Sequence, residues 1–219
     1  TAGKNTSLES IEQIEENGKK YIVAKLKLND VASDYTIKYA LANDGALEIQ
    51  ASYKKGNNPV PELPRFGMIF TLKNTLENLD YYGRGPLENY PDRKTSSLKG
   101  IYTSKVADQY VPYTRPQENG YKTDIRWFRL SGNKGNGLEI KGLQPLGMST
   151  LNNYPSDFDG GISKKNIHSS DITPREEVVV CVDLTQRGLG GDNSWGLPPH
   201  EQYVLTQSEY SYGFVIKPL

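Results

Sequence analysis

This chain of 219 residues contains few cysteines and histidines, and its formal net charge is zero. Cys181 is its one cysteine, which excludes an internal disulfide and a thiolate metal cluster. The apolar run Val178–Val182 around it predicts a buried, inert thiol. The 26 basic side chains balance the 26 acidic ones, so no net field attracts nucleic acid or an anionic membrane. We therefore expect neither nucleic acid nor membrane as a partner.

Long apolar runs and sustained helical periodicity are also missing. No run approaches the length that spans a bilayer, and only Leu8, Ile11 and Ile14 could form a short helical face. Thr1 is not an initiator methionine and no signal-peptide pattern follows it, so we expect a processed or excised piece of a longer chain. Residues 157–161 resemble a calcium loop only faintly, since its distal glutamate is missing, and they predict a turn.

Alternating apolar and polar residues, separated by turn signals, fill most of the chain. Asn17-Gly18 lies between two apolar runs, which indicates a hairpin and favours a strand over a helix at residues 8–14. Further strands are predicted at residues 35–41, 47–53, 66–72, 124–130, 138–141, 176–184 and 209–216. This pattern predicts an all-β fold, a large antiparallel sandwich. We interpret the polar loop at residues 54–59 as a connection within one domain, 1–219, whose first strands lie in residues 1–60.

Three segments rich in glycine, proline, tyrosine and charge interrupt the strand pattern. They are Tyr81–Arg93, Tyr110–Gly120 and Arg187–Trp195. Glycine permits backbone angles closed to other residues, whereas proline fixes its own angle and donates no hydrogen bond. We therefore expect each segment to leave a strand and form a shaped loop. From the residues alone, a purely structural loop and a binding loop both stay open.

The three segments, in this order, resemble the C-terminal domain of the family 2 glycoside hydrolases, the bacterial β-galactosidases. The resemblance lies in residues 83–93, 110–120 and 190–195, and Leu63–Gly67 is similar to a further motif of the family. It covers residues 60–219, whereas the first sixty match by strand pattern only. The resemblance implies a supersandwich similar in fold to galactose mutarotases, within an enzyme that hydrolyses β-galactosides such as lactose in the cytoplasm or periplasm of a bacterium.

The same resemblance implies that the catalytic glutamates and the metal sites lie upstream, in a TIM-barrel domain. We therefore expect no catalytic residue, no metal and no cofactor in this chain, and no hydrolysis by it alone. The partners that the resemblance implies are galactoside sugars and the upstream domains of the parent enzyme. Assembly into a homo-oligomer stays open.

Trp195 is the main candidate for sugar contact. It follows the polar, glycine-rich Gly190–Ser194 and offers an apolar ring face with an N–H at its edge. From the residues alone, a packing anchor is the commoner role of a loop tryptophan. The resemblance implies instead a platform that stacks on the bound sugar, with Asp192 and Asn193 beside it, although Asn193 stands where the family usually has aspartate. Trp127, inside a predicted strand, is assigned to the core.

Arg84, Arg115 and Glu118 are further candidate residues of the sugar pocket. For the carboxylate–amide pairs Glu88-Asn89 and Glu118-Asn119, hydrogen bonds that hold the loops are the favoured role.

His168 supports an alternative function. A freestanding mutarotase-like enzyme needs a histidine and a carboxylate for acid–base catalysis, and His168 could be that acid. A structural histidine is the commoner case, because no partner carboxylate can be named. A second alternative is a structural or assembly domain in which Trp195 is buried at an interface.

Overall fold

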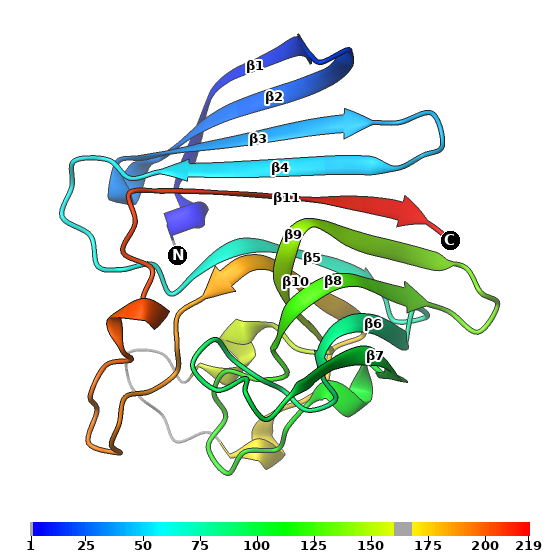
Figure 1. Ribbon diagram of the computed structural model, residues 1–219, viewed down its shortest axis with the longest axis vertical. Coiled ribbons are helices and arrows are strands. Elements are labelled where there is room, and N and C mark those ends of the chain that lie inside the picture. The colour runs from blue at the N-terminus through cyan, green and yellow to red at the C-terminus, as the bar shows by residue number, and fades with distance from the viewer. Residues whose placement is uncertain (1, 160–167) are drawn as a thin grey trace.

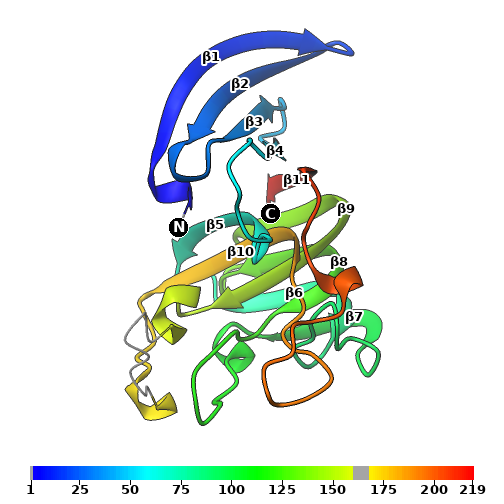
Figure 2. The same ribbon diagram turned by 90° about the vertical axis from the view of Figure 1, so that its left-hand side faces the viewer.

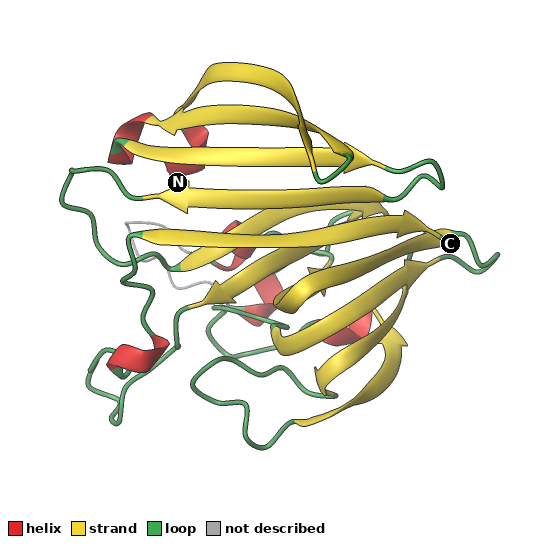
Figure 3. Cartoon of the chain, turned by 45° about the horizontal axis from the view of Figure 1, so that its top comes forward, coloured by secondary structure: helices red, strands yellow, loops and turns green. Residues whose placement is uncertain are grey.

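The computed structural model describes residues 2–159 and 168–219, which form an all-β fold of antiparallel strands (Figure 3). The strands are β1 (Thr6–Glu16), β2 (Lys19–Leu28), β3 (Ser33–Leu41), β4 (Leu47–Lys54), β5 (Arg65–Lys73), β6 (Asn78–Gly85), β7 (Leu98–Lys105), β8 (Lys122–Ser131), β9 (Gly137–Leu151), β10 (Glu177–Gln186) and β11 (Glu209–Pro218). Short 3-10 helices are η1 (Ala2–Lys4), η2 (Asn29–Val31), η3 (Ala107–Gln109), η4 (Pro155–Phe158), η5 (Ser169–Asp171) and η6 (Glu201–Tyr203). Within these ranges no helix has the length and apolar character to cross a membrane. The predicted all-β antiparallel fold is confirmed.

The hairpin at Asn17-Gly18 forms as predicted. Glu16 pairs with Lys19 across the turn, and Asn17 and Gly18 have φ angles of 54° and 74°. Two consecutive positive φ angles match the right-handed twist of the flanking strands, and asparagine and glycine adopt them readily. Leu8, Ile11 and Ile14 therefore belong to strand β1, and the helical alternative is excluded.

Two layers are built from one continuous network of strands. The order is β1-β2-β3-β4-β11-β9-β8-β6-β7, and β10 pairs with both β9 and β5. Figure 1 shows β1 to β4 and β11 above the other strands, and Figure 2 shows β1 and β2 curving over them. The first part of β9, Leu138–Gly142, pairs with β11, whereas its last part, Gly147–Leu151, pairs with β10. Pro145 separates the two parts and cannot donate a ladder hydrogen bond. β9 thus connects the layers.

Phe66 on β5 packs the lower layer against the upper one. Its ring centroid lies 5.4 Å from that of Tyr212 and 5.9 Å from that of Tyr210, both on β11. The rings of Tyr53 on β4 and Tyr35 on β3 each lie at 6.2 Å. Aromatic pairs at such separations stabilise a core beyond the area they bury. Residues on both sides of the loop at 54–59 therefore share one core.

Parts of the strand prediction were incomplete. β7 was not predicted, because it has no buried face: only Gly100, Tyr102 and Ser104 are half-buried, and its other side chains are exposed. The segment Tyr81–Arg93 was expected to form a loop, but Tyr81–Gly85 belongs to β6 and the loop begins at Pro86. β9 runs past Pro145 to Leu151, although proline and glycine ordinarily mark turns.

Trp127 does not lie in the core, so its assignment there was wrong. The side chain is half-buried, and the Arg129 guanidinium lies 4.9 Å from the centroid of its ring. Phe128, between them in β8, is fully buried, and alternation along a strand turns both of its neighbours outward. Cys181 is buried as predicted, and burial raises the pKa of its thiol to about 11.

Lys122 on β8 is a buried cation, with only 2% of its surface exposed. Its ammonium lies 5.7 Å from the centroid of the Tyr81 ring. Burial lowers the pKa of Lys122 to about 8, and attraction to the Glu88 carboxylate opposes this only in part. In the unfolded chain the ammonium is solvated and its pKa returns to the ordinary value of 10.5. Folding at neutral pH therefore carries the cost of burying this charge.

This cost predicts a pH-dependent stability. Between pH 8 and 10.5 the unfolded chain binds more protons at Lys122 than the folded chain does, so the free energy of unfolding rises with pH. Lys122→Met removes the buried charge and should raise the free energy of unfolding near neutral pH by up to about 3 kcal/mol. The gain should shrink as the pH approaches 10.5. Urea unfolding of both chains across this range measures the difference.

Lys134→Met, in an exposed turn, is the matched control for the loss of one lysine and should change the free energy of unfolding near neutral pH by no more than about 0.5 kcal/mol. A gain from Lys122→Met that stays constant across the same range would contradict the assignment of the buried charge.

Candidate functional site

The first loop, residues 86–93, holds the second loop, residues 110–120, through Glu88. The Glu88 carboxylate accepts hydrogen bonds from the Gly120 amide at 2.8 Å, from the Tyr90 hydroxyl at 3.1 Å and from the Tyr113 hydroxyl. Hydrogen bonds to an ionised acceptor are about twice as strong as neutral ones. Glu88 therefore ties the two loops together, which confirms the scaffolding role predicted for it.

Asn89 and Asn119 complete this scaffold. The side-chain oxygen of Asn89 accepts from the Thr123 amide at 3.0 Å and from its hydroxyl at 2.6 Å, while Nδ2 donates to the Arg84 carbonyl at 3.1 Å. Asn119 bonds both backbone groups of Val111, at 2.9 and 2.7 Å. Both amides are buried, where polar groups need such partners. The predicted role of these asparagines is confirmed.

Asp92, which also belongs to the first loop, connects that loop to a third loop, residues 187–200. One of its carboxylate oxygens accepts from the Leu189 amide at 2.9 Å and from the Gly190 amide at 3.2 Å. A Cβ at Gly188 would lie 2.9 Å from the Asp92 carboxyl carbon, so the close approach depends on glycine there. The sequence prediction missed Asp92, because nothing in the chain pairs it with glycines about a hundred residues later.

The third loop presents Trp195 to solvent. The indole-bearing residue is 89% exposed, and its backbone amide donates to the Asn193 side-chain oxygen at 2.9 Å. Asp192 Oδ1 lies 2.7 Å from His200 Nε2, which closes the loop on itself. His200 is exposed, and the sequence did not predict its contact with Asp192, because a spacing of eight residues is not a known pairing signal. Asp192, Asn193 and Trp195 are thus brought together.

The donor groups of the Arg84 side chain are used in structural hydrogen bonds. Its guanidinium donates to the Asp124 carboxylate at 2.7 Å and to the carbonyls of Ser97 at 2.7 Å and Lys94 at 3.2 Å. Burial acts to raise the pKa of Asp124, but the Arg84 hydrogen bond and the charges of Lys94 and Lys99 outweigh it and hold that pKa below its ordinary value. The Arg84 side chain therefore joins the end of β6 to the segment 94–97 and to β8.

The other predicted site residues belong to other segments of the chain. Arg115 and Glu118 are exposed on the second loop. His168 is exposed before η5, where its backbone amide donates to Asp171 at 2.8 Å. In the described part of the chain, no hydrogen bond or ion pair joins these three side chains to the third loop. Their roles stay predictions.

The predicted turn at residues 157–161 begins in η4. Arg175 binds the Asp157 carboxylate with two hydrogen bonds of 2.7 Å. Gly160 and Gly161 lie outside the described residues. Among residues 2–159 and 168–219, no group of three or more histidines, cysteines or carboxylates is placed to hold a metal ion.

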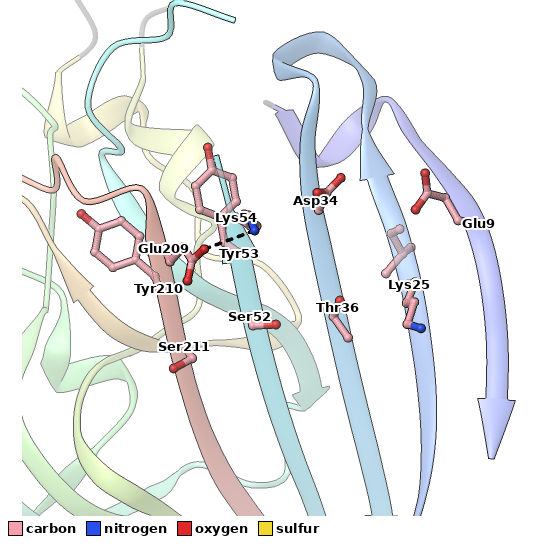
Figure 4. A pocket seen from close by; sticks show the side chains of 11 residues that line it. Glu9, Lys25, Asp34, Thr36, Ser52, Tyr53, Lys54, Glu209, Tyr210 and Ser211 are labelled. Carbon is pink, nitrogen blue, oxygen red and sulfur yellow. Dashed lines mark ion pairs between the residues drawn. The ribbon is translucent and has the colours of Figure 1, made fainter. Parts of the chain in front are cut away.

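A polar hollow of about 580 Å³ lies on the outer face of the upper layer (Figure 4). Lys25, Thr36, Ser52 and Ser211 face one another across β2, β3, β4 and β11. None of the predicted sugar-contacting residues lines it. The sequence alone could not predict that these side chains lie near one another, because each comes from a different strand.

A comparison with models of protein families identifies the family to which this chain belongs. The model of the β-galactosidase small-chain family matches residues 1–216. The chain belongs to this family.

Its relatives are much longer proteins. A β-galactosidase of Priestia megaterium is 38% identical over 192 residues, which cover 87% of this chain and 18% of that protein. A β-galactosidase of Streptococcus thermophilus is 31% identical over 94% of this chain and 20% of its own length. The β-galactosidase BgaC of Bifidobacterium adolescentis is 31% identical over 78% of this chain and 16% of its own length. The chain thus spans a fifth or less of each of these proteins.

Solved structures with a similar arrangement of strands include two carbohydrate-related proteins. A GalM/aldose epimerase homologue from C. elegans matches with a TM-score of 0.44 and 11% identity, over 96% of this chain and 69% of that one. An α-galactosidase from Lactobacillus brevis matches with a TM-score of 0.47 and 9% identity, over 98% and 26%. These likenesses concern the fold alone.

The contacts of Asp92 predict that this carboxylate orders the third loop. Asp92→Ala removes the acceptor of the Leu189 and Gly190 amides, so their backbone order parameters should fall below about 0.6. Asp92→Asn keeps a side-chain oxygen acceptor and is the matched variant, in which the amides should stay ordered. ¹⁵N relaxation measures both. Unchanged order in Asp92→Ala would show that the loop is held by other contacts.

Proposed function

We propose that this chain is the C-terminal domain of a family 2 glycoside hydrolase, a β-galactosidase that cleaves terminal β-galactosides such as lactose. In this proposal the domain packs against the rest of the enzyme and lends Trp195 to the substrate site. The family match over residues 1–216 supports the placement within a β-galactosidase. The exposed Trp195 on an anchored loop supports the sugar contact.

The exposure of Trp195 is the observation that carries the proposal. An indole that is 89% exposed leaves a large apolar ring in water, which is unfavourable unless a ligand or partner covers it. The ring face matches the C–H side of a sugar, and the indole N–H can donate to a hydroxyl. Asp92 and the Asp192–His200 pair restrict the loop, so less freedom is lost when the ring meets a sugar.

The hydrolytic chemistry is proposed to lie elsewhere in the enzyme. Glycoside hydrolysis needs two carboxyl groups, one on each side of the scissile bond. The carboxylates that join the three loops already have structural donors: Glu88 accepts from three, and one oxygen of Asp92 accepts from the Leu189 and Gly190 amides and from the Arg93 guanidinium. A catalytic pair and any metal ion therefore belong, in this proposal, to the upstream domain. The isolated chain should not hydrolyse galactosides.

The kinetic prediction concerns Trp195 in the complete enzyme. Trp195→Ala removes the apolar platform, and we expect kcat/KM for lactose to fall about tenfold. Trp195→Phe keeps an aromatic face but no N–H donor, and should retain part of the activity. Initial rates over a range of lactose concentrations measure both variants. Unchanged kcat/KM with altered assembly would favour a purely structural role of the indole.

A second measurement uses the isolated chain. The indole N–H signals of Trp195 and Trp127 are titrated with galactose and then lactose, and Trp127, held beneath Arg129, serves as the reference. Movement of the Trp195 signal alone supports a preformed sugar contact. If neither signal moves, sugar binding needs the rest of the enzyme. Interconversion of galactose anomers by this chain would support the mutarotase-like alternative with His168 instead.

A further inference from the structure

The main strand order begins with β1 and ends with β7, and these two edge strands differ in character (Figure 1). The ladder between β1 and β2 is irregular near Leu8, and β1 carries the acidic side chains Glu9, Glu12, Glu15 and Glu16. Charges and irregularities of this kind keep an edge strand from pairing with another chain. β7 has neither: its ladder with β6 is regular, and its only charged side chains are Lys99 and Lys105.

Every second residue of β7 directs its backbone N–H and C=O away from β6. The Val106 amide donates to the Glu77 carbonyl at 2.9 Å, so these two residues form a hydrogen-bonded pair. Hydrogen-bonded and non-hydrogen-bonded pairs alternate along an antiparallel ladder. The odd-numbered residues of β7 therefore form the non-hydrogen-bonded pairs with β6, and their backbone groups point to the free edge.

The chain itself closes one end of this edge. Two residues of η3 do so: the Asp108 carboxylate accepts from the Lys105 amide at 3.3 Å, and the Gln109 side chain donates to the Lys105 carbonyl at 3.2 Å. Among the strands of the described residues, only β6 pairs with β7. The outward backbone groups of residues 99–103 are therefore open to a strand from outside the chain.

A row of apolar side chains leads to the same edge. Ile101 lies opposite Tyr82 on β6, and Tyr82 lies opposite Trp127 on β8. Residues directly opposite each other share a face of the sheet. Ile101 is 70% exposed and Tyr82 is 40% exposed. The row thus ends, uncovered, at the strand whose backbone groups are unpaired.

From these two features we infer that β7 pairs with β7 of a second copy of the chain, about a twofold axis at Ile101. This pairing goes beyond the proposed function, since it requires no sugar. Around this axis Ile101 lies opposite Ile101 of the partner subunit, and Lys99 lies opposite Thr103 of the partner subunit. Odd-numbered residues meet odd-numbered residues, so the outward N–H and C=O groups of both strands find partners. The two apolar rows join and cover each other's exposed end.

Charge favours this register over its neighbours. An axis at Tyr102 would place Lys99 opposite Lys105 of the partner subunit, and like charges directly opposite destabilise strand pairing. An axis at Gly100 would place Ile101 opposite Lys99 of the partner subunit, so the apolar rows would not meet. With the axis at Ile101, no two charged side chains of β7 lie opposite each other. A twofold pair also closes on itself, whereas contact between β7 and the acidic β1 of a next copy would build rings or filaments.

Cross-linking in the complete enzyme tests the position of the axis. Ile101→Cys brings two thiols together, because the Cα atoms of a hydrogen-bonded pair lie about 5.5 Å apart. Leu98→Cys is the matched control on the same strand, since Leu98 is 72% exposed and Ile101 is 70% exposed. The two copies of position 98 would lie about 20 Å apart along the strands. A short bis-maleimide is added, and cross-linked peptides are identified by mass spectrometry. We expect cross-linking between the two copies of position 101 to be at least tenfold faster than at position 98.

Equal rates at the two positions, or no cross-link at either, would overturn the inference. A second pair of variants measures the assembly itself. Ile101→Lys places two ammonium groups opposite each other and should lower the mass found by sedimentation velocity, whereas Leu98→Lys should not. The same mass for both variants would also contradict the pairing. Neither measurement involves Trp195, so full activity of Trp195→Ala together with the cross-link at position 101 would reject the sugar contact and keep the paired strands.

Discussion

The arrangement of the three loops depends on acceptor side chains within one short segment. Glu88 and Asn89 bind the second loop and the start of β8, while Asp92, three residues on, binds the backbone of the third. Loops far apart in the chain are thus organised by hydrogen bonds to a single turn that follows β6. Buried carboxylates lose favourable hydration, so they need these donors as much as the loops need the acceptors. The exposed indole of Trp195 is consequently carried by a loop that is hydrogen-bonded to this turn rather than by a free loop.

The strand network provides the platform for that turn. Because β9 pairs with β11 in one layer and with β10 in the other, the layers cannot slide past each other without breaking a ladder. Phe66 adds a side-chain contact between them, since its ring meets tyrosines of β3, β4 and β11. The loops leave the lower layer, whereas β1 and β2 lie at the outer margin of the upper one.

Local signals in the sequence predicted what depends on neighbouring residues. Asn17-Gly18 predicted the hairpin, and the valines around Cys181 predicted a buried strand, because both features follow from short-range backbone and burial preferences. The sequence did not predict that Asp92 meets Gly190 or that Asp192 meets His200, since those contacts depend on how distant loops are placed. The prediction for Trp127 failed for a different reason. A strand has two faces, and an aromatic residue can lie on the outer one, beneath an arginine.

Exposed apolar side chains differ in what they indicate. An exposed isoleucine alone needs no explanation, and Ile22 lies between Tyr21 and Val23, which are buried with Ala40 in a second apolar cluster on the opposite face of the same strands. The exposed indole of Trp195 is a different case, because its loop is held by Asp92 and by the Asp192–His200 pair. A large apolar ring presented to water by an anchored loop fits a platform for a ligand or for a partner surface.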